Sequence, residues 1–221
     1  MIKAVIFDMD GVIIRSEPLW ERAVDIQMKR NNIDLSKDKG YQSFVSLHIR
    51  GRSQRYVIKM FKQRYGLQGS YQILLEERLK ILLKLFKEEL TLIPGVCNLI
   101  KLLHRNHIPL IVASSSPKRV VNFSLKKFEL KKFFTHVLSG DDVVKAKPQP
   151  DIFLYGAKLL KVKPNQTLVI EDSINGIKAA SRAGMKCIAL KQPYTLARYH
   201  KLATKSVGKL SDIKLSTITN L

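Results

Sequence analysis

The chain has 221 residues, 45% of them hydrophobic, which is enough to bury a sizeable core in one large domain or two smaller ones. It contains no apolar run of the roughly 18 residues that a membrane span needs, and its first residues do not resemble a secretion signal. We therefore expect a soluble, cytoplasmic protein that binds no membrane. Cys97 and Cys187 lie among apolar neighbours, which indicates core thiols in a reducing compartment.

The net charge is strongly positive at +21, because the chain has 39 Lys and Arg residues but only 18 Asp and Glu residues. Three explanations compete: nucleic-acid binding, attraction of anionic phosphorylated substrates, and a general lysine bias of the source proteome. The lysines are spread along nearly the whole chain, whereas a nucleic-acid-binding face would concentrate them. Most of the excess is therefore expected to be solvated surface, and nucleic acid is not the expected partner.

The first predicted element is a short buried strand over residues 4–7, which are all apolar and which Asp8 follows directly. Asp10 comes two residues later, so the two carboxylates should project to the same side of an extended backbone. Two like charges so close together need a cation or a shared proton. The alternative interpretation is a strand that ends in a solvated acidic turn.

Residues 16–90 favour helices throughout. Ser16 is a candidate N-cap and Pro18 suits the first turn of a helix that runs to Arg30. Further helices are predicted over 45–49, from Ser53 to about residue 65, and over 71–90, where apolar residues recur at steps of three and four. No stretch of this segment has a convincing strand pattern, so it is predicted to be a helical insert.

From residue 92 onward, strands alternate with helices. Strands are predicted over 108–113, 135–138, 167–170 and 186–190, with one weaker strand and a short tail within 206–221. Helices are predicted after Pro94-Gly95 and over 120–128, 151–160 and 174–183. This alternation is typical of an α/β fold with a doubly wound parallel sheet. The predicted domains are an α/β core, 1–15 with 91–221, and an inserted helical cap, 16–90.

The predicted strands end in polar residues that suit phosphoryl transfer, namely Asp8 and Asp10, then Ser114, then Glu171 and Asp172. The carboxyl ends of parallel strands meet at one sheet edge, and Lys147 lies just upstream of a predicted helix near that edge. Oxygen ligands from Asp8, the Asp10 carbonyl and Asp172 would suit Mg²⁺. The metal and Lys147 would neutralise the phosphate, so that Asp8 can attack phosphorus and form an aspartyl-phosphate.

Two further roles complete this predicted site. Asp10 would protonate the leaving alcohol and then take a proton from the hydrolytic water. Ser114 and the adjacent backbone amides could hold the transferring phosphoryl group.

Four segments then resemble the motifs of haloacid dehalogenase-like phosphohydrolases: Asp8-Met-Asp-Gly-Val, Ala113-Ser114-Ser115, Lys147-Pro148-x-Pro150-Asp151 and Val169-Ile170-Glu171-Asp172-Ser173. The resemblance implies a Rossmann-like core and Mg²⁺ as cofactor. It implies these site residues: Asp8 as nucleophile, Asp10 as acid and base, Ser114, Ser115 and Lys147 on phosphate, and Asp8, Asp10, Glu171 and Asp172 at the metal. Asp10 argues against the dehalogenases themselves, which lack the second acid.

The insert resembles the helical cap of the subgroup that holds β-phosphoglucomutase, phosphoglycolate phosphatase and small sugar-phosphate phosphatases. Arg50, Gly51 and Arg52 resemble its substrate-specificity loop, although an ordinary interhelical turn is the alternative. Trp20 is a further candidate for substrate specificity in the cap, and it stands about where the mutases carry a histidine. Two more positions depart from the subgroup: Arg15 replaces an acidic residue in the hinge, and Ala146 replaces a common glycine.

The sequence therefore predicts a Mg²⁺-dependent phosphatase, a phosphoric monoester hydrolase that acts on small phosphorylated metabolites such as sugar or polyol phosphates. We expect a monomer. The first alternative is a mutase of the β-phosphoglucomutase type. The second is a basic protein that keeps the fold without the activity and binds nucleic acid or protein.

Overall fold

A computed structural model describes residues 1–193, 201–219 and 221. Within these residues six parallel strands form one sheet in the order β3-β2-β1-β4-β5-β6. The strands are β1 (Ala4–Phe7), β2 (Leu110–Ala113), β3 (His136–Leu138), β4 (Thr167–Glu171), β5 (Lys186–Leu190) and β6 (Lys205–Val207). The order places β1 in the interior of the sheet, between β2 and β4, and the predicted doubly wound α/β fold is confirmed.

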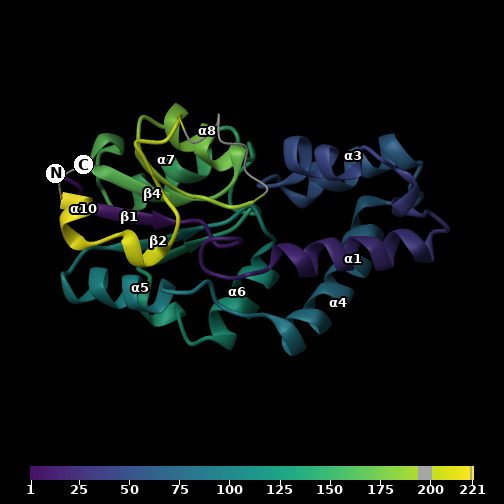
Figure 1. Ribbon diagram of the computed structural model, residues 1–221, viewed down its shortest axis with the longest axis horizontal. Helices are drawn as coiled ribbons and strands as arrows, with labels where there is room; N and C mark the ends of the chain where they lie inside the picture. The colour runs from purple at the N-terminus through teal and green to yellow at the C-terminus, as the bar shows by residue number, and fades with distance from the viewer. Residues whose placement is uncertain (194–200, 220) are drawn as a thin grey trace.

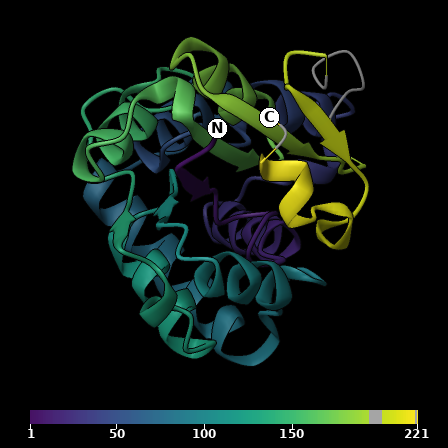
Figure 2. The same ribbon diagram turned by 90° about the vertical axis from the view of Figure 1, so that its left-hand side faces the viewer.

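Helices cover both faces of the sheet (Figures 1 and 2). Helices α5 (Val96–Arg105) and α6 (Lys118–Lys127) cover one face, and α7 (Asp151–Leu159) and α8 (Ile174–Arg182) cover the other. Val5 and Phe7 belong to the core on the α5 and α6 side, whereas Ile6 packs with residues of α7 and α8. Because both faces are buried, β1 is apolar at every position.

The inserted segment is helical, as predicted. Its elements are α1 (Glu17–Arg30), the short helix α2 (Tyr41–Phe44), a π-helical turn η2 (Val45–Ile49), α3 (Gln54–Tyr65) and α4 (Tyr71–Glu89). The structure describes all of residues 16–90 and places no strand among them. Phe44, Phe61 and Leu74 belong to a hydrophobic cluster within these helices, which we call the cap.

Two neighbouring backbone segments join the cap to the sheet. Ile14 and Leu92 form an antiparallel bridge, and Arg15 N donates to Thr91 O at 2.9 Å. The chain therefore leaves and re-enters the core at one place, where a hinge would lie. The predicted boundaries fall beside this bridge, and the division into two domains stays a prediction.

Several predicted bounds shift. Strand β2 begins at Leu110 and not at residue 108, where Pro109 lacks the N–H that a ladder needs. The C-terminal segment holds β6 and also a short helix, α10 (Leu215–Thr219), which was not predicted. The remaining elements among the described residues are 3₁₀ turns: η1 (Leu35–Lys37), η3 (Lys131–Phe133), η4 (Pro164–Gln166) and η5 (Leu210–Asp212). No helix within the described ranges has the length and apolar character needed to cross a membrane.

Candidate active site

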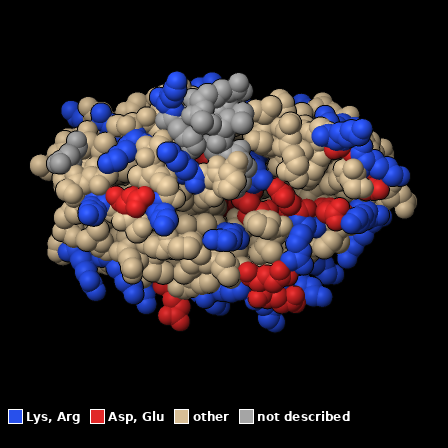
Figure 3. Space-filling model, viewed as in Figure 1, with Lys and Arg blue, Asp and Glu red and all other residues tan. Residues whose placement is uncertain are grey.

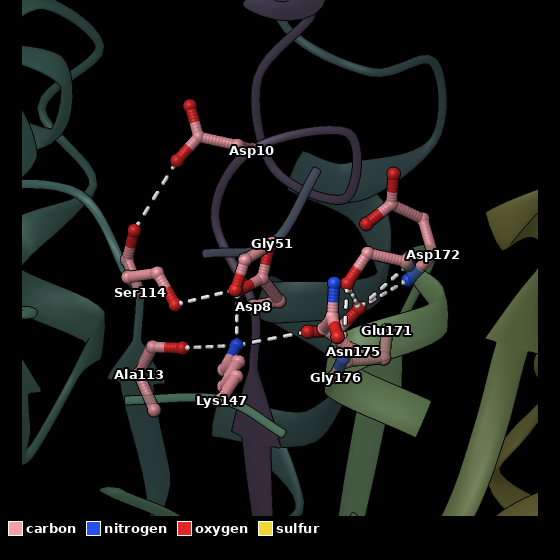
Figure 4. A network of polar contacts seen from close by, with 12 residues as sticks. Asp8, Asp10, Gly51, Ala113, Ser114, Lys147, Glu171, Asp172, Asn175 and Gly176 are labelled. Carbon is pink, nitrogen blue, oxygen red and sulfur yellow. Dashed lines mark hydrogen bonds and ion pairs between the residues drawn. The ribbon is translucent and has the colours of Figure 1, made fainter. Parts of the chain in front are cut away.

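The predicted strand-end residues meet at one edge of the sheet, as Figure 4 shows. Asp8 directly follows β1, Ser114 follows β2, and Glu171 and Asp172 stand at the end of β4. The core and the cap together line one cavity next to this edge. Asp8, Asp10, Ser115 and Asp172 line it from the core side.

Lys147 is at the centre of the polar network and is almost fully buried. Its ammonium donates to Asp8 Oδ1 at 2.5 Å, to Glu171 Oε1 at 2.8 Å and to the Ala113 carbonyl at 3.1 Å. An ammonium has three N–H donors, and protein acceptors take all three here. Lys147, predicted to contact phosphate, would therefore have to exchange one of these bonds to do so.

Glu171 is held in place by donors on both of its carboxylate oxygens. Oε1 accepts from Lys147, and Oε2 accepts from the backbone N–H groups of Asp172 and Ser173, each at 2.8 Å, and from Ser173 Oγ at 3.0 Å. A Cβ atom on Gly176 would overlap the Glu171 carboxylate, so only glycine fits at this point of α8. Glu171 is thus rigidly placed beside Asp8 and Asp172.

Burial and charge set the protonation of this network. Burial raises the pKa of Asp8 well above its usual range, Lys147 opposes that shift, and Glu171 adds to it. For Lys147 burial acts against the charged form, but Asp8 and Glu171 outweigh it and raise its pKa. The buried ammonium is therefore charged at neutral pH.

The carboxylates of Asp8, Glu171 and Asp172 could bind one metal ion, because one oxygen of each lies within 4.8 Å of the others. Three carboxylates against the single ammonium of Lys147 leave two negative charges. A divalent cation with oxygen ligands would balance them, which is the preference of Mg²⁺. The residues present therefore fit the predicted metal.

The Asp10 carboxylate accepts hydrogen bonds from both sides of the cavity. Its Oδ1 accepts from Ser16 Oγ at 2.6 Å and from Trp20 Nε1 at 3.1 Å. Its Oδ2 accepts from Ser116 Oγ at 2.8 Å and from Ser114 Oγ at 3.2 Å. Asp10 thus lies between helix α1 of the cap and the loop after β2.

Two serines at Asp10 differ from what the sequence indicated. Ser16 does occupy the N-cap position of α1, but its hydroxyl makes no cap hydrogen bond and donates to Asp10 instead. Ser116 was not predicted at the site, although it is the third serine of a run that the sequence displays. Trp20, predicted as a cap residue near substrate, does line the cavity.

The loop of Arg50, Gly51 and Arg52 is docked on the core through its backbone. Asn175 Nδ2 donates to the Arg50 carbonyl at 2.7 Å, and Ser115 Oγ donates to the Gly51 carbonyl at 2.9 Å. Ser115, predicted to bind phosphate, thus directs its hydroxyl to the cap loop. Asn175 was not predicted, because nothing in a helix-start sequence reveals a partner in a distant segment.

Gly51 is the point of closest approach in this loop. Its φ is +72°, in the left-handed region that favours glycine. A Cβ atom at this position would overlap Ser173 Oγ. The loop therefore needs glycine for its conformation and for its contact with the core.

The side chain of Arg50 binds within the cap. Its guanidinium pairs with Glu17 and with Glu21 of α1, at 2.5 Å in each case. Burial raises the pKa of Glu17 to about 7, with Arg50 acting in the opposite direction. Arg50 therefore links the docked loop to the helix that carries Trp20.

Arg52, in contrast, extends toward the core. Its guanidinium lies over the Tyr56 ring, 4.3 Å from the ring centre, and its Nη1 donates to the Lys147 carbonyl at 3.4 Å.

Comparison with known proteins agrees with the predicted family. Residues 2–184 match the family model described as haloacid dehalogenase-like hydrolase. The chain is 31% identical to hexitol phosphatase B of Escherichia coli K12, over all of this chain and 94% of that protein. It is also 31% identical to the phosphorylated carbohydrates phosphatase of Thermotoga maritima, over 85% of this chain and 84% of that one.

A solved structure shares the whole architecture. CbbY from Rhodobacter sphaeroides, crystallised in complex with phosphate, superposes with a TM-score of 0.86 at 26% identity. The match covers 99% of this chain and 100% of that one, so it includes both the sheet and the cap.

Proposed function

Because the chain belongs to the haloacid dehalogenase-like hydrolase family, we propose that it is a Mg²⁺-dependent phosphatase that uses an aspartyl-phosphate intermediate. The observation that carries the proposal is the placement of two carboxylates on one cavity in different surroundings. Asp8 is paired with a buried ammonium, whereas Asp10 is bound by hydroxyls and an indole N–H. Such a difference suits a nucleophile and a proton carrier.

In this proposal Asp8 attacks phosphorus as the bond to the ester oxygen breaks. Lys147 binds Oδ1 of Asp8, which leaves the second carboxylate oxygen to form the new bond. Asp10 gives its proton to the leaving alkoxide and later takes one from the water that attacks the phosphorus of the aspartyl-phosphate. This attack breaks the bond between Asp8 and phosphorus, releases inorganic phosphate and returns Asp8 as a carboxylate.

Asp8, Asp172 and the Asp10 carbonyl would hold Mg²⁺, with Glu171 beside them. The ion would neutralise phosphoryl oxygens so that an anionic nucleophile can approach. Binding has a readout apart from activity: Mg²⁺ should raise the unfolding temperature of the wild type, and Asp172→Asn should lose most of that rise. An equal rise in both proteins would contradict the ligand assignment.

Sugar or polyol phosphates are the proposed substrate class. The relatives named above act on hexitol phosphates and phosphorylated carbohydrates, according to their names. The test is a panel of sugar, polyol, nucleotide and two-carbon phosphates assayed for phosphate release with Mg²⁺ and with excess EDTA. Release that depends on Mg²⁺ supports the proposal, whereas full activity in EDTA contradicts it.

A mutase is the second candidate, and Trp20 argues against it. An indole N–H can donate one hydrogen bond to Asp10 but cannot relay a proton. We therefore propose water as the usual acceptor. The test is to incubate the protein with β-glucose 1-phosphate and a trace of glucose 1,6-bisphosphate and to follow both products. Glucose 6-phosphate that forms much faster than free phosphate would favour the mutase.

A monomeric state and a cytoplasmic location stay predictions, which light scattering and cell fractionation would check.

A further inference from the structure

Arg78 of helix α4 is a fully buried cation inside the cap. Its Nε donates to Gln27 Oε1 at 2.8 Å and its Nη1 donates to Gln54 Oε1 at 3.1 Å. Its Nη2 is buried and has no hydrogen-bond partner within the described part of the chain. The guanidinium also lies 5.5 Å from the centre of the Phe61 ring. Both of its hydrogen-bonded partners are therefore neutral amides.

No carboxylate among residues 1–193, 201–219 and 221 forms an ion pair with Arg78. Glu77 is its neighbour in sequence, but Glu77 accepts from Gln27 Nε2 at 3.1 Å and pairs with Arg30 at 3.7 Å. Burial lowers the pKa of Arg78 to about 10, so the side chain still carries its charge at neutral pH. A buried charge without a counter-ion is costly, and an anionic ligand would offset that cost.

The same cavity that Asp8 and Asp172 line on the core side is lined on the cap side by Arg78 and Gln54. Between these two sides the cap contributes apolar walls, including Val57 and Phe61. A ligand whose phosphate lies at Asp8 extends toward the cap, because the rest of the cavity lies there. The unused donor of Arg78 is then a cationic group available to its other end.

Glu17 and Glu21 line the cavity too, and Arg50 pairs with both of these carboxylates. Arg52 also lines the cavity and its Nε has no hydrogen-bond partner within the described residues, but it reaches the Lys147 carbonyl on the core side.

We propose that Arg78 binds a second anionic group, a carboxylate or a phosphate, at the end of the substrate remote from the reacting ester. Within the proposed class of sugar and polyol phosphates, the preferred substrates are then those that carry a second anionic group, namely phosphorylated sugar acids or bisphosphates. This inference rests on the proposed function, because it takes the phosphate at Asp8 as the reacting end. Arg78 acts as a specificity-determining residue with no part in the bond-breaking step.

The experiment measures binding without turnover, so that its outcome is independent of whether the protein is a phosphatase. Asp8→Asn protein with Mg²⁺ is titrated calorimetrically with glucitol 6-phosphate, 6-phosphogluconate and glucitol 1,6-bisphosphate. One charged hydrogen bond should make at least one of the two probes with an anionic second end bind about tenfold tighter than the neutral-ended one. A larger gain in affinity for 6-phosphogluconate indicates a carboxylate site, and a larger gain for the bisphosphate indicates a phosphate site.

The second arm adds Arg78→Met, which keeps the length of the side chain and removes its charge. In this variant the anionic-ended and neutral-ended probes should bind with about equal affinity. Arg30 is an exposed arginine of the cap, and Arg30→Met should keep the tenfold preference. The ratio of two probe affinities for one variant does not depend on the fraction of that variant that is folded. Partial unfolding of Arg78→Met would therefore leave the measured preference unchanged. Equal affinity of all three probes for the Asp8→Asn protein, or a preference that survives Arg78→Met, would overturn the proposal.

Discussion

At Asp10, one carboxylate accepts from four side chains, and two of these donors belong to the start of α1. The position of the acid therefore depends on the cap as well as on the sheet. Ser16 and Trp20 hold Oδ1, so a displacement of α1 would release half of the contacts that orient this group. We infer that Trp20 is a positioning residue for Asp10.

Trp20→Phe keeps an aromatic ring and removes only the N–H that reaches Asp10. We expect kcat to fall about tenfold, because one hydrogen bond to a charged acceptor is lost, while KM changes little. Steady-state phosphate release measures both constants, and the unfolding temperature checks that the fold is kept. An unchanged kcat would show that Ser16 alone suffices to orient the acid.

Some residues of the site could be predicted from the sequence, and others could not. Asp8, Glu171 and Asp172 could be predicted because strand ends have fixed positions in a parallel sheet. Arg78 and Asn175 could not, because a helical pattern predicts which face is buried but not which partner that face meets. Ser16 shows the same limit: its position as N-cap was right, but a tertiary acceptor took its hydroxyl.

At the scale of elements, the loop between η2 and α3 connects the cap to the catalytic edge of the sheet. Its backbone carbonyls accept from Ser115 and Asn175 of the core, while the Arg50 side chain pairs with α1. Docking of the loop and placement of α1 are therefore coupled through one residue. The sequence indicated a loop with two arginines, but it could not indicate that the backbone makes these contacts.

Gly51→Ala tests this docking, and Gly66→Ala is its matched control. Both glycines have a left-handed φ, +72° and +68°, so alanine is strained at each. Only at Gly51 would the new Cβ atom meet the core, because a Cβ atom at Gly66 would point into open space. We expect the shared backbone strain to cost about 1–2 kcal/mol of unfolding free energy in each variant, with a further loss in Gly51→Ala from the overlap with Ser173.

Only Gly51→Ala should lose catalytic efficiency, by about tenfold to 100-fold, since the loop can no longer seat against Ser173. Chemical denaturation and kcat/KM provide the two readouts. Equal catalytic losses in the two variants would mean that strain, and not docking, explains the effect.

At the scale of the whole molecule, the charge is +21 and the basic side chains are dispersed. Figure 3 shows Lys and Arg spread over the visible face of both the sheet region and the cap, with acidic residues interspersed. A field of this kind attracts anions in general and selects no particular partner. It fits capture of phosphorylated substrates, one of the three explanations that the composition left open.

Salt should therefore lower kcat/KM for a phosphate ester several-fold and leave kcat nearly constant. The reason is that the Debye length shrinks from about 30 Å at 0.01 M to about 8 Å at 0.15 M ionic strength. Initial rates across that range check the expectation. Tight binding of duplex or single-stranded nucleic acid near 0.15 M salt would instead favour the binding-protein alternative.

Much of the architecture could be predicted from patterns in the sequence. Alternating strands and helices define the parallel sheet, and the helical pattern of residues 16–90 defines the cap. The short tail helix α10 escaped prediction because five residues carry too little periodicity to be distinguished from a loop. The pairing of cap and core side chains depends on tertiary contacts that no local pattern records.

The central claim is that Asp8 is the nucleophile, and phosphate release by Asp8→Asn with Mg²⁺ tests it most directly. An amide is a poor nucleophile, so we expect turnover to fall by about three orders of magnitude or more, while Asp25→Asn, a partly exposed control on α1, stays near wild type. Asp8→Asn protein that keeps a tenth of wild-type phosphate release would contradict the account.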